Sequence, residues 1–267
     1  MKKITILDGA VGTELWKAAE AAGLAKAPVW TYNLTAPQLV TELHKKYIEA
    51  GSEIICTNTF SANIPVVEKE GFNWEEVIET AVSLAKKAAE GRCRTALDLG
   101  PLFTALEPFG NTTEVECRDI YRRLCEKGAK AGADLIFLET FMDSDMLEYA
   151  AEEAKKTGLE LFCSMSFEKT GKTLYGASPA SMMEALSDAA PDAVGLNCSF
   201  GPADAVSVMK AFREITDLPL ILKPNTADMD AQSFADAMDL SAGIVDYIGA
   251  CCGSDPEYIT ELKQRFA

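Results

Sequence analysis

The sequence predicts a single α/β domain with the (β/α)8 barrel fold. Short apolar runs alternate with longer helical segments, and a strand followed by a helix is the repeating unit of parallel α/β folds. Eight such units follow one another along the chain. The length of 267 residues is close to the roughly 250 residues that are typical of the barrel. We find no linker or low-complexity run, so we expect one domain over residues 1–267.

Each strand and helix is expected from its local pattern. The expected strands are 4–8, 53–59, 94–99, 134–139, 160–166, 193–198, 219–223 and 245–251. The expected helices are 37–50, 74–90, 113–131, 145–157, 178–188, 202–215, 230–241 and 256–266. Proline near the first turn marks helix starts at Pro37, Pro179 and Pro256, because the first turn does not need the missing N–H. Helices are expected to end before Gly51 and Gly132, since glycine readily adopts the left-handed cap.

A doubly wound open sheet is the alternative fold. That fold usually carries a glycine-rich phosphate loop, G-x-G-x-x-G, after the first strand. Here the corresponding loop reads Asp8-Gly9-Ala10-Val11-Gly12-Thr13, which does not match. The barrel is therefore the better prediction.

Composition excludes several classes of partner. The net charge is −16, from 25 basic and 41 acidic residues, and no basic patch is visible, so we do not expect binding to nucleic acid. No apolar run approaches the roughly 20 residues that a membrane span needs, and the start of the chain is too short and polar for a signal peptide. Eight cysteines without any mark of secretion predict reduced thiols in a cytoplasmic protein.

His44 is the single histidine, which excludes HExxH zinc sites and leaves at most one residue for a histidine relay. It lies in the polar, helical-looking segment 42–46. We therefore expect a surface histidine without a catalytic role.

Three cysteines lie at the ends of two expected strands, where barrel enzymes place their sites. Cys198 ends one strand, and Cys251 and Cys252 close another. Three thiols can form a tetrahedral metal site with one open position, although buried apolar cysteines would explain them equally well. Adjacent cysteines in a regular strand point to opposite faces, so if both bind one ion the strand must end or bend there, as Gly249 and Gly253 would allow. The other cysteines are expected to be structural: Cys56, Cys93, Cys117, Cys125 and Cys163.

Polar side chains collect at the other strand ends. Glu139 ends an apolar strand, where a carboxylate is costly unless it has a partner, so we favour a functional role. Asp8 is either functional or a turn former. Asp98 could pair with a basic residue inside the barrel, for which Lys223 is the candidate. Asn58 and its neighbouring threonines either bind a ligand or satisfy loop backbone.

Four segments resemble the homocysteine S-methyltransferase family, and they occur in that family's order over nearly the whole chain. Segments 195–198 (Gly-Leu-Asn-Cys) and 249–257 (Gly-Ala-Cys-Cys-Gly-Ser-Asp-Pro-Glu) resemble its zinc signatures. Segments 7–15 and 47–60 resemble two other parts of it. Ala250 replaces a frequent glycine and Ser254 a frequent threonine, and neither change removes a ligand.

The resemblance implies a zinc-bearing barrel that methylates the thiol of homocysteine to give methionine. By resemblance, Cys198, Cys251 and Cys252 hold the zinc, and Asp8 and Glu139 help to bind the substrate amino group. The resemblance also makes the backbone amides of the turn 9–13 candidates for binding the substrate carboxylate: Gly9, Ala10, Val11, Gly12 and Thr13. Asn58 is kept as a further candidate for substrate binding.

The methyl donor stays open at this point. The family uses methylcobalamin, betaine or S-methylmethionine, and this chain has no D-x-H-x-x-G cobalamin motif. Segment 99–140 resembles the homocysteine module of cobalamin-dependent methionine synthase, which favours a corrinoid protein as donor. Two alternatives remain: a zinc methyltransferase for another small thiol, and a non-catalytic zinc- or thiol-binding subunit of a corrinoid complex.

Overall fold

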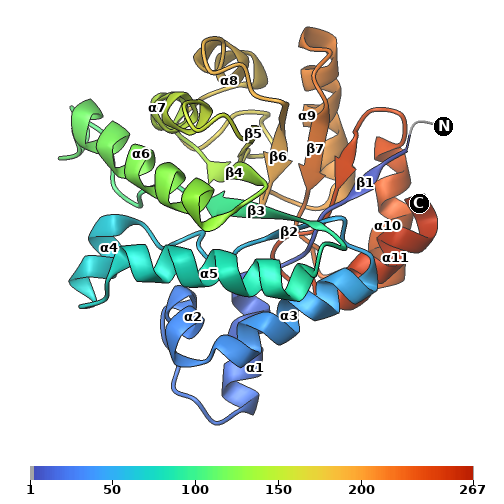
Figure 1. Ribbon diagram of the computed structural model, residues 1–267. Helices are drawn as coiled ribbons and strands as arrows, with labels where there is room; N and C mark the ends of the chain where they lie inside the picture. Colours follow the sequence, from blue (N-terminus) through green and yellow to red (C-terminus); the bar gives the residue numbers. More distant parts are fainter. Residues whose placement is uncertain (1–2, 267) are drawn as a thin grey trace.

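The computed structural model describes residues 3–266 and shows the predicted (β/α)8 barrel (Figure 1). Its strands form one parallel sheet in the order β1-β8-β7-β6-β5-β4-β3-β2. The Glu53 amide donates to the Ile6 carbonyl at 2.7 Å, which joins the two ends of the sheet and closes the barrel. The strands are β1 (Thr5–Ile6), β2 (Ile54–Cys56), β3 (Arg94–Leu99), β4 (Leu135–Phe141), β5 (Glu160–Met165), β6 (Ala193–Asn197), β7 (Leu220–Lys223) and β8 (Tyr247–Ile248).

Helices surround the sheet on its outer side (Figure 1). They are α1 (Val11–Ala21), α2 (Tyr32–Thr35), α3 (Pro37–Ala50), α4 (Ile64–Lys69), α5 (Trp74–Ala89), α6 (Glu114–Ala131), α7 (Ser144–Lys155), α8 (Pro179–Ala185), α9 (Pro202–Ile215), α10 (Ala231–Met238) and α11 (Pro256–Phe266), with 3-10 turns at Val29–Thr31 and Asp239–Ser241. The predicted proline starts of α3, α8 and α11 are confirmed. So are the glycine ends, because Gly51 and Gly132 have φ of 114° and 98°.

The sequence patterns missed three helices: α1, α2 and α4. The most important is α1, because segment 9–13 was expected to be a glycine turn. Helix α1 begins at Val11, so the second half of that segment is the first turn of a helix. Ala10 precedes it without a side-chain cap, which removes the usual sequence signal of a helix start.

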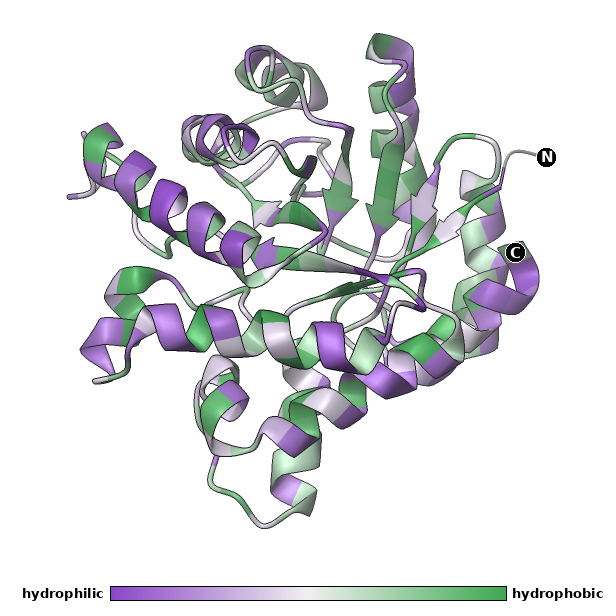
Figure 2. Ribbon diagram, in the orientation of Figure 1, coloured by the Kyte–Doolittle hydropathy of each residue, from purple (hydrophilic) through white to green (hydrophobic). Residues whose placement is uncertain are grey.

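The core has two parts, one inside the barrel and one between the sheet and the helices. Side chains alternate along each strand, so that Leu135 and Phe137 lie in the inner cluster while Ile136 and Leu138 lie in the outer one. Figure 2 shows that strands β6 and β7 are hydrophobic, whereas helix α6 is hydrophilic along much of its length. Among residues 3–266, no helix is long and apolar enough to cross a membrane.

His44 contradicts the expected surface position. Its side chain is completely buried on the inner face of α3, together with Val40 and Tyr47. These residues have helical spacing, which places them on one face, and this packing outweighs the polar residues next to His44 in the sequence. Neither ring nitrogen has a hydrogen-bond partner within the described part of the chain.

Candidate metal centre and substrate cavity

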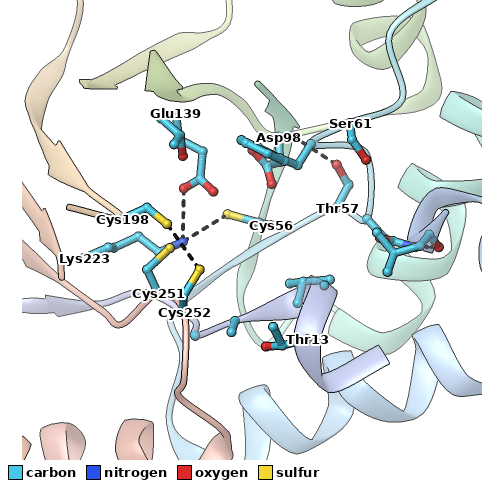
Figure 3. Close-up of a pocket in the computed structure, with 18 of the residues that line it drawn as sticks. Thr13, Cys56, Thr57, Ser61, Asp98, Glu139, Cys198, Lys223, Cys251 and Cys252 are labelled. Atoms are coloured by element: carbon cyan, nitrogen blue, oxygen red, sulfur yellow. Dashed lines mark hydrogen bonds and ion pairs between the residues drawn. The ribbon is translucent and has the colours of Figure 1, made fainter. Parts of the chain in front are cut away.

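Cys198, Cys251 and Cys252 come together at the carboxyl ends of the strands, which we call the mouth of the barrel (Figure 3). Their sulfur atoms all lie within 4.8 Å of one another, and the Cys198 and Cys252 Sγ atoms are 3.3 Å apart. Strand β8 ends at Ile248, so the two adjacent cysteines lie in a loop. The strand ends ahead of the cysteines, in agreement with the prediction that it must end or bend there, but β8 is shorter than the expected strand 245–251. The loop turns at Gly253, whose φ is 91°.

The thiols of the cluster differ in pKa in the metal-free protein. Hydrogen bonds with Cys198 and Cys251 lower the pKa of Cys252, because they stabilise its thiolate. Hydrogen bonds with Cys198 and Cys252 raise the pKa of Cys251 well above its usual value, and burial adds to this effect. One thiolate held by two thiols is therefore the favoured state when no cation replaces the protons.

Alternation along the strands also builds the polar mouth. On β4, Glu139 follows Leu135 and Phe137 at a spacing of two residues and therefore points to the inside of the barrel. The same spacing places Asp98 above Ala96 on β3, and Lys223 above Ile221 on β7. Each of these three strands thus presents an apolar residue to the barrel core and a polar one to the mouth.

Lys223 is the cation at the centre of this polar group (Figure 3). Its Nζ lies 3.0 Å from an Asp8 carboxylate oxygen, 3.4 Å from one of Glu139, and 3.7 Å from Cys56 Sγ. The expected pairing with Asp98 is wrong, because β7 and β3 are four positions apart in either direction around the barrel. Strand β1 is only two positions from β7, so Asp8 is the nearer partner.

Asp8 is placed differently from the other predicted site residues. Its side chain is completely buried and is not among the residues that line the cavity. One carboxylate oxygen accepts from the Cys56 amide at 2.6 Å, and the other is paired with Lys223. Asp8 is therefore placed to act on the site through Lys223.

A cavity of about 350 Å³ opens beside the three cysteines. Ten of the eleven predicted site residues line it: Gly9, Ala10, Val11, Gly12, Thr13, Asn58, Glu139, Cys198, Cys251 and Cys252. The Asn58 side chain donates to the Val29 carbonyl at 2.8 Å and to Asn33 at 3.1 Å. Its amide group thus holds the neighbouring segment in place.

The beginning of helix α1 forms one wall of the cavity. The amides of Val11, Gly12 and Thr13 belong to the first turn, where no carbonyl of the same helix can accept from them. The preceding Ala10 amide donates to Ser254 Oγ at 3.0 Å, and the Ala10 carbonyl accepts from the Tyr47 hydroxyl at 2.8 Å. This wall can therefore bind an anionic group.

A family model described as homocysteine S-methyltransferase matches residues 5–266. The chain belongs to the homocysteine S-methyltransferase family. The resemblance stated above from four sequence segments is thereby confirmed over the length of the barrel.

The names of similar proteins point to more than one methyl donor, because two of the three given below state a donor and the two donors differ. The rat S-methylmethionine–homocysteine S-methyltransferase BHMT2 is 27% identical over 93% of this chain and 75% of its own length. The mouse betaine–homocysteine S-methyltransferase 1 is 26% identical over 94% of this chain and 70% of its own. The methionine synthase of Mycobacterium leprae is 25% identical over 100% of this chain, which corresponds to 24% of that longer protein.

Solved structures agree on the fold. The oxidized form of the homocysteine methyltransferase MmuM from Escherichia coli superposes with a TM-score of 0.85 at 24% identity, covering 98% of this chain and 96% of MmuM. Its metallated form gives a TM-score of 0.84 at 23% identity.

Several cavity residues of this family member were not expected from the sequence. Cys56 was expected to be structural, yet it lines the cavity next to Lys223. Phe60 and Trp16 supply apolar walls. Asp98 was interpreted as a possible partner of Lys223 and not as a substrate-binding residue, yet it lines the cavity.

Proposed function

We propose that this protein is a zinc-dependent methyltransferase that moves a methyl group to the thiol of homocysteine, giving methionine. The observation that carries the proposal is the combination of three thiols at one end of a cavity with an anion-binding wall and a carboxylate on its other sides. We also propose that residues 1–267 work as one homocysteine-binding barrel domain.

The residues of the cysteine cluster fit a zinc ion. Structural and catalytic zinc sites bind thiolates at about 2.3 Å in tetrahedral geometry, which places sulfur atoms about 3.8 Å apart. The three sulfur atoms here lie within 4.8 Å of one another, so small side-chain adjustments suffice. Cys198, Cys251 and Cys252 would hold the ion, and a zinc ion bound by them would lower the pKa of the substrate thiol and so favour its thiolate.

The cavity walls suit the amino-acid end of homocysteine. We propose that the first-turn amides of α1 bind the substrate carboxylate, because that helix end carries unsatisfied N–H groups and a partial positive charge. Glu139 is placed to accept from the substrate ammonium. Lys223 compensates the charge of Asp8, which keeps a buried carboxylate stable beside the site.

The chemical step needs little more from the protein than orientation. The thiol proton leaves for solvent when the substrate binds as a thiolate. The sulfur then attacks the methyl carbon of the donor, so that an S–C bond forms while the bond to the donor breaks. No general base is needed in that step, which agrees with a buried His44 that does not line the cavity.

We propose that the donor is a methylated corrinoid protein or a small methyl donor supplied in trans. The names of the relatives support both classes, since they include methionine synthase as well as enzymes for S-methylmethionine and betaine. We further propose that the protein is cytoplasmic, where its eight free cysteines would stay reduced. Binding to nucleic acid or to a membrane is not part of the proposal.

A donor panel tests the function. Zinc-loaded protein is incubated with homocysteine and, separately, S-methylmethionine, betaine, methylcobalamin and a methylated corrinoid protein, and methionine is quantified. We expect methionine with at least one donor. Binding of homocysteine without methionine from any donor would favour a non-catalytic thiol-binding subunit. Faster methylation of another small thiol in the same assay would change the acceptor.

A further inference from the structure

The end of β4 departs from a regular strand directly after Glu139. The pairing of β4 with β5 slips between Leu138 and Phe141, where β4 carries one extra residue. This is a β-bulge, and bulges are frequent beside active sites because they redirect side chains. Leu138 and Phe141 both pack in the outer core, and the two residues between them, Glu139 and Thr140, both line the cavity.

Thr140 forms this bulge with an unfavourable backbone. Its φ is 65°, in the left-handed region, which a β-branched residue rarely adopts. Such a conformation persists only where neighbouring groups hold it. In a regular strand, alternation would instead place Thr140 on the outer face of the sheet and Phe141 inside the barrel. The conformation of Thr140 therefore decides which side chains the end of β4 presents to the cavity.

Asn197, the last residue of β6, holds Thr140 through both ends of its side-chain amide. Its Oδ1 accepts from the Thr140 amide at 2.7 Å, and its Nδ2 donates to Thr140 Oγ1 at 2.6 Å. The same Oδ1 accepts from Ser164 Oγ at 2.7 Å, so the side chain reaches from β6 across β5 to β4. Asn197 is completely buried and does not line the cavity. It can therefore act on the cavity only through its neighbours.

Asn197 is also joined directly to a ligand of the metal centre. Cys198 follows it in the chain and has a φ of 49°, so it lies in the left-handed region as well. Separate hydrogen bonds hold Cys198. Its amide donates to the Lys223 carbonyl at 3.1 Å, and its carbonyl accepts from Ser166 Oγ at 3.1 Å. One buried side chain thus connects the metal centre with the end of β4.

Resting on the function proposed above, we propose that Asn197 is a positioning residue that holds the end of β4 at the distance from the metal centre that homocysteine spans. The substrate sulfur would lie at the three cysteines and its ammonium at Glu139, so binding both ends requires a fixed separation. Such precision needs hydrogen bonds from supporting side chains. Without the Asn197 amide, Thr140 relaxes and the adjoining Glu139 shifts, whereas Cys198 keeps its own hydrogen bonds.

Two ligands that differ only in the amino group separate this role from a general defect. Homocysteine and 4-mercaptobutanoate share the thiol, the chain length and the carboxylate. Their dissociation constants are measured by calorimetry on the zinc-loaded parent and on Asn197→Ala. We expect Asn197→Ala to bind homocysteine about tenfold more weakly, because both hydrogen bonds that hold Thr140 are lost. Binding of 4-mercaptobutanoate should change by less than about twofold, and zinc content should stay the same.

Thr140→Gly provides a rescue that a merely structural role of Asn197 would not show. Glycine adopts a positive φ without steric cost, so the bulge no longer needs the Asn197 amide. In the Thr140→Gly background, Asn197→Ala should therefore weaken homocysteine binding by no more than about threefold. A loss of about tenfold in both backgrounds would overturn the positioning role, because the two residues would then act independently.

Ser164→Ala is the matched control, because it removes the third hydrogen bond of Asn197 and leaves the two bonds to Thr140. Ser164 is also completely buried and does not line the cavity. This variant should bind both thiols as the parent does. A selective loss of homocysteine as large as that in Asn197→Ala would contradict the role assigned to the Thr140 contact.

Thr140→Val replaces Asn197→Ala if that variant does not fold. It loses only the bond to Oγ1, so homocysteine binding should weaken about fivefold. Unchanged homocysteine binding in the variant used, or equal weakening of both thiols at unchanged zinc content, would overturn the positioning role and leave the proposed function intact. A parent that binds neither thiol would overturn the proposed function and the positioning role with it.

Discussion

Cys198, Cys251 and Cys252 are the residues whose loss should remove the metal. We expect the purified protein to hold about one zinc per chain, because three thiolates with one open position form a common zinc site. Replacing any one of the three by alanine should abolish retention, since two thiolates cannot hold the ion as tightly. Metal content by plasma mass spectrometry measures this.

Cys117→Ala is the control for the cysteine series. Cys117 is completely buried in α6 and lies outside the cavity, so this variant should keep its zinc. Full zinc retention in Cys251→Ala would contradict the site.

Glu139 should affect the substrate without affecting the metal. Glu139→Gln keeps the shape of the side chain and removes its charge. A charge-assisted hydrogen bond contributes about 1.5–3 kcal/mol, so homocysteine should bind about 10- to 100-fold more weakly. Zinc content and the affinity for 4-mercaptobutanoate should stay the same. Unchanged affinity for homocysteine would make Glu139 structural.

At the scale of elements, Ser254 connects the start of α1 to the cysteine loop. Its Oγ accepts from the Ala10 amide at 3.0 Å and donates to the Cys251 carbonyl at 2.8 Å, and the side chain is completely buried. Gly9 lies against this contact, since a Cβ there would be 2.7 Å from Ser254 Oγ. One hydroxyl thus fixes both the anion-binding wall and the metal loop.

Ser254→Ala should therefore destabilise the protein. The buried Ala10 amide loses its partner, whereas the Cys251 carbonyl keeps the backbone amide of residue 254 at 3.2 Å, and leaving one such group unsatisfied costs about 1–3 kcal/mol. Urea unfolding of the metal-free protein measures the change in the free energy of unfolding. Ser207→Ala is the control, because the Ser207 hydroxyl bonds the Asp204 carbonyl on an exposed part of α9. Its effect should stay within about 0.5 kcal/mol, and a similar loss in both variants would contradict the prediction.

At the scale of the whole molecule, His44 should make stability depend on pH. Burial lowers the pKa of His44 to about 4. In the unfolded chain its pKa is about 6.5, so between these values the unfolded state binds a proton that the folded state excludes. This contribution to stability is complete above about pH 6.5 and is lost as the pH falls toward 4. Between pH 7 and pH 5 the loss should be about 2 kcal/mol.

A variant without the titrating ring isolates this effect from the carboxylates. His44→Leu is suitable because neither ring nitrogen has a partner to lose among residues 3–266. The free energy of unfolding is measured at both pH values with zinc removed from both proteins. The parent should lose about 2 kcal/mol more than His44→Leu on acidification. Parallel pH curves would show that His44 does not titrate on unfolding.

Most of the fold could be predicted because its signals are local. Apolar runs and helical periodicity placed the strands and the long helices, and α3, α9 and α11 have the expected bounds. Helices α1, α2 and α4 escaped because they are short or lack a side-chain cap at a residue such as Ala10. His44 was misplaced because its neighbours in the sequence are polar while its helix face is apolar.

By itself, the sequence determined the order of strand and helix units, the cysteines at two strand ends and the family. These features depend on residues that are close along the chain. The tertiary structure alone decided that Lys223 pairs with Asp8 and leaves Asp98 open to the cavity. That choice depends on the positions of β7, β1 and β3 around the closed barrel, and hence on distances between residues far apart in sequence.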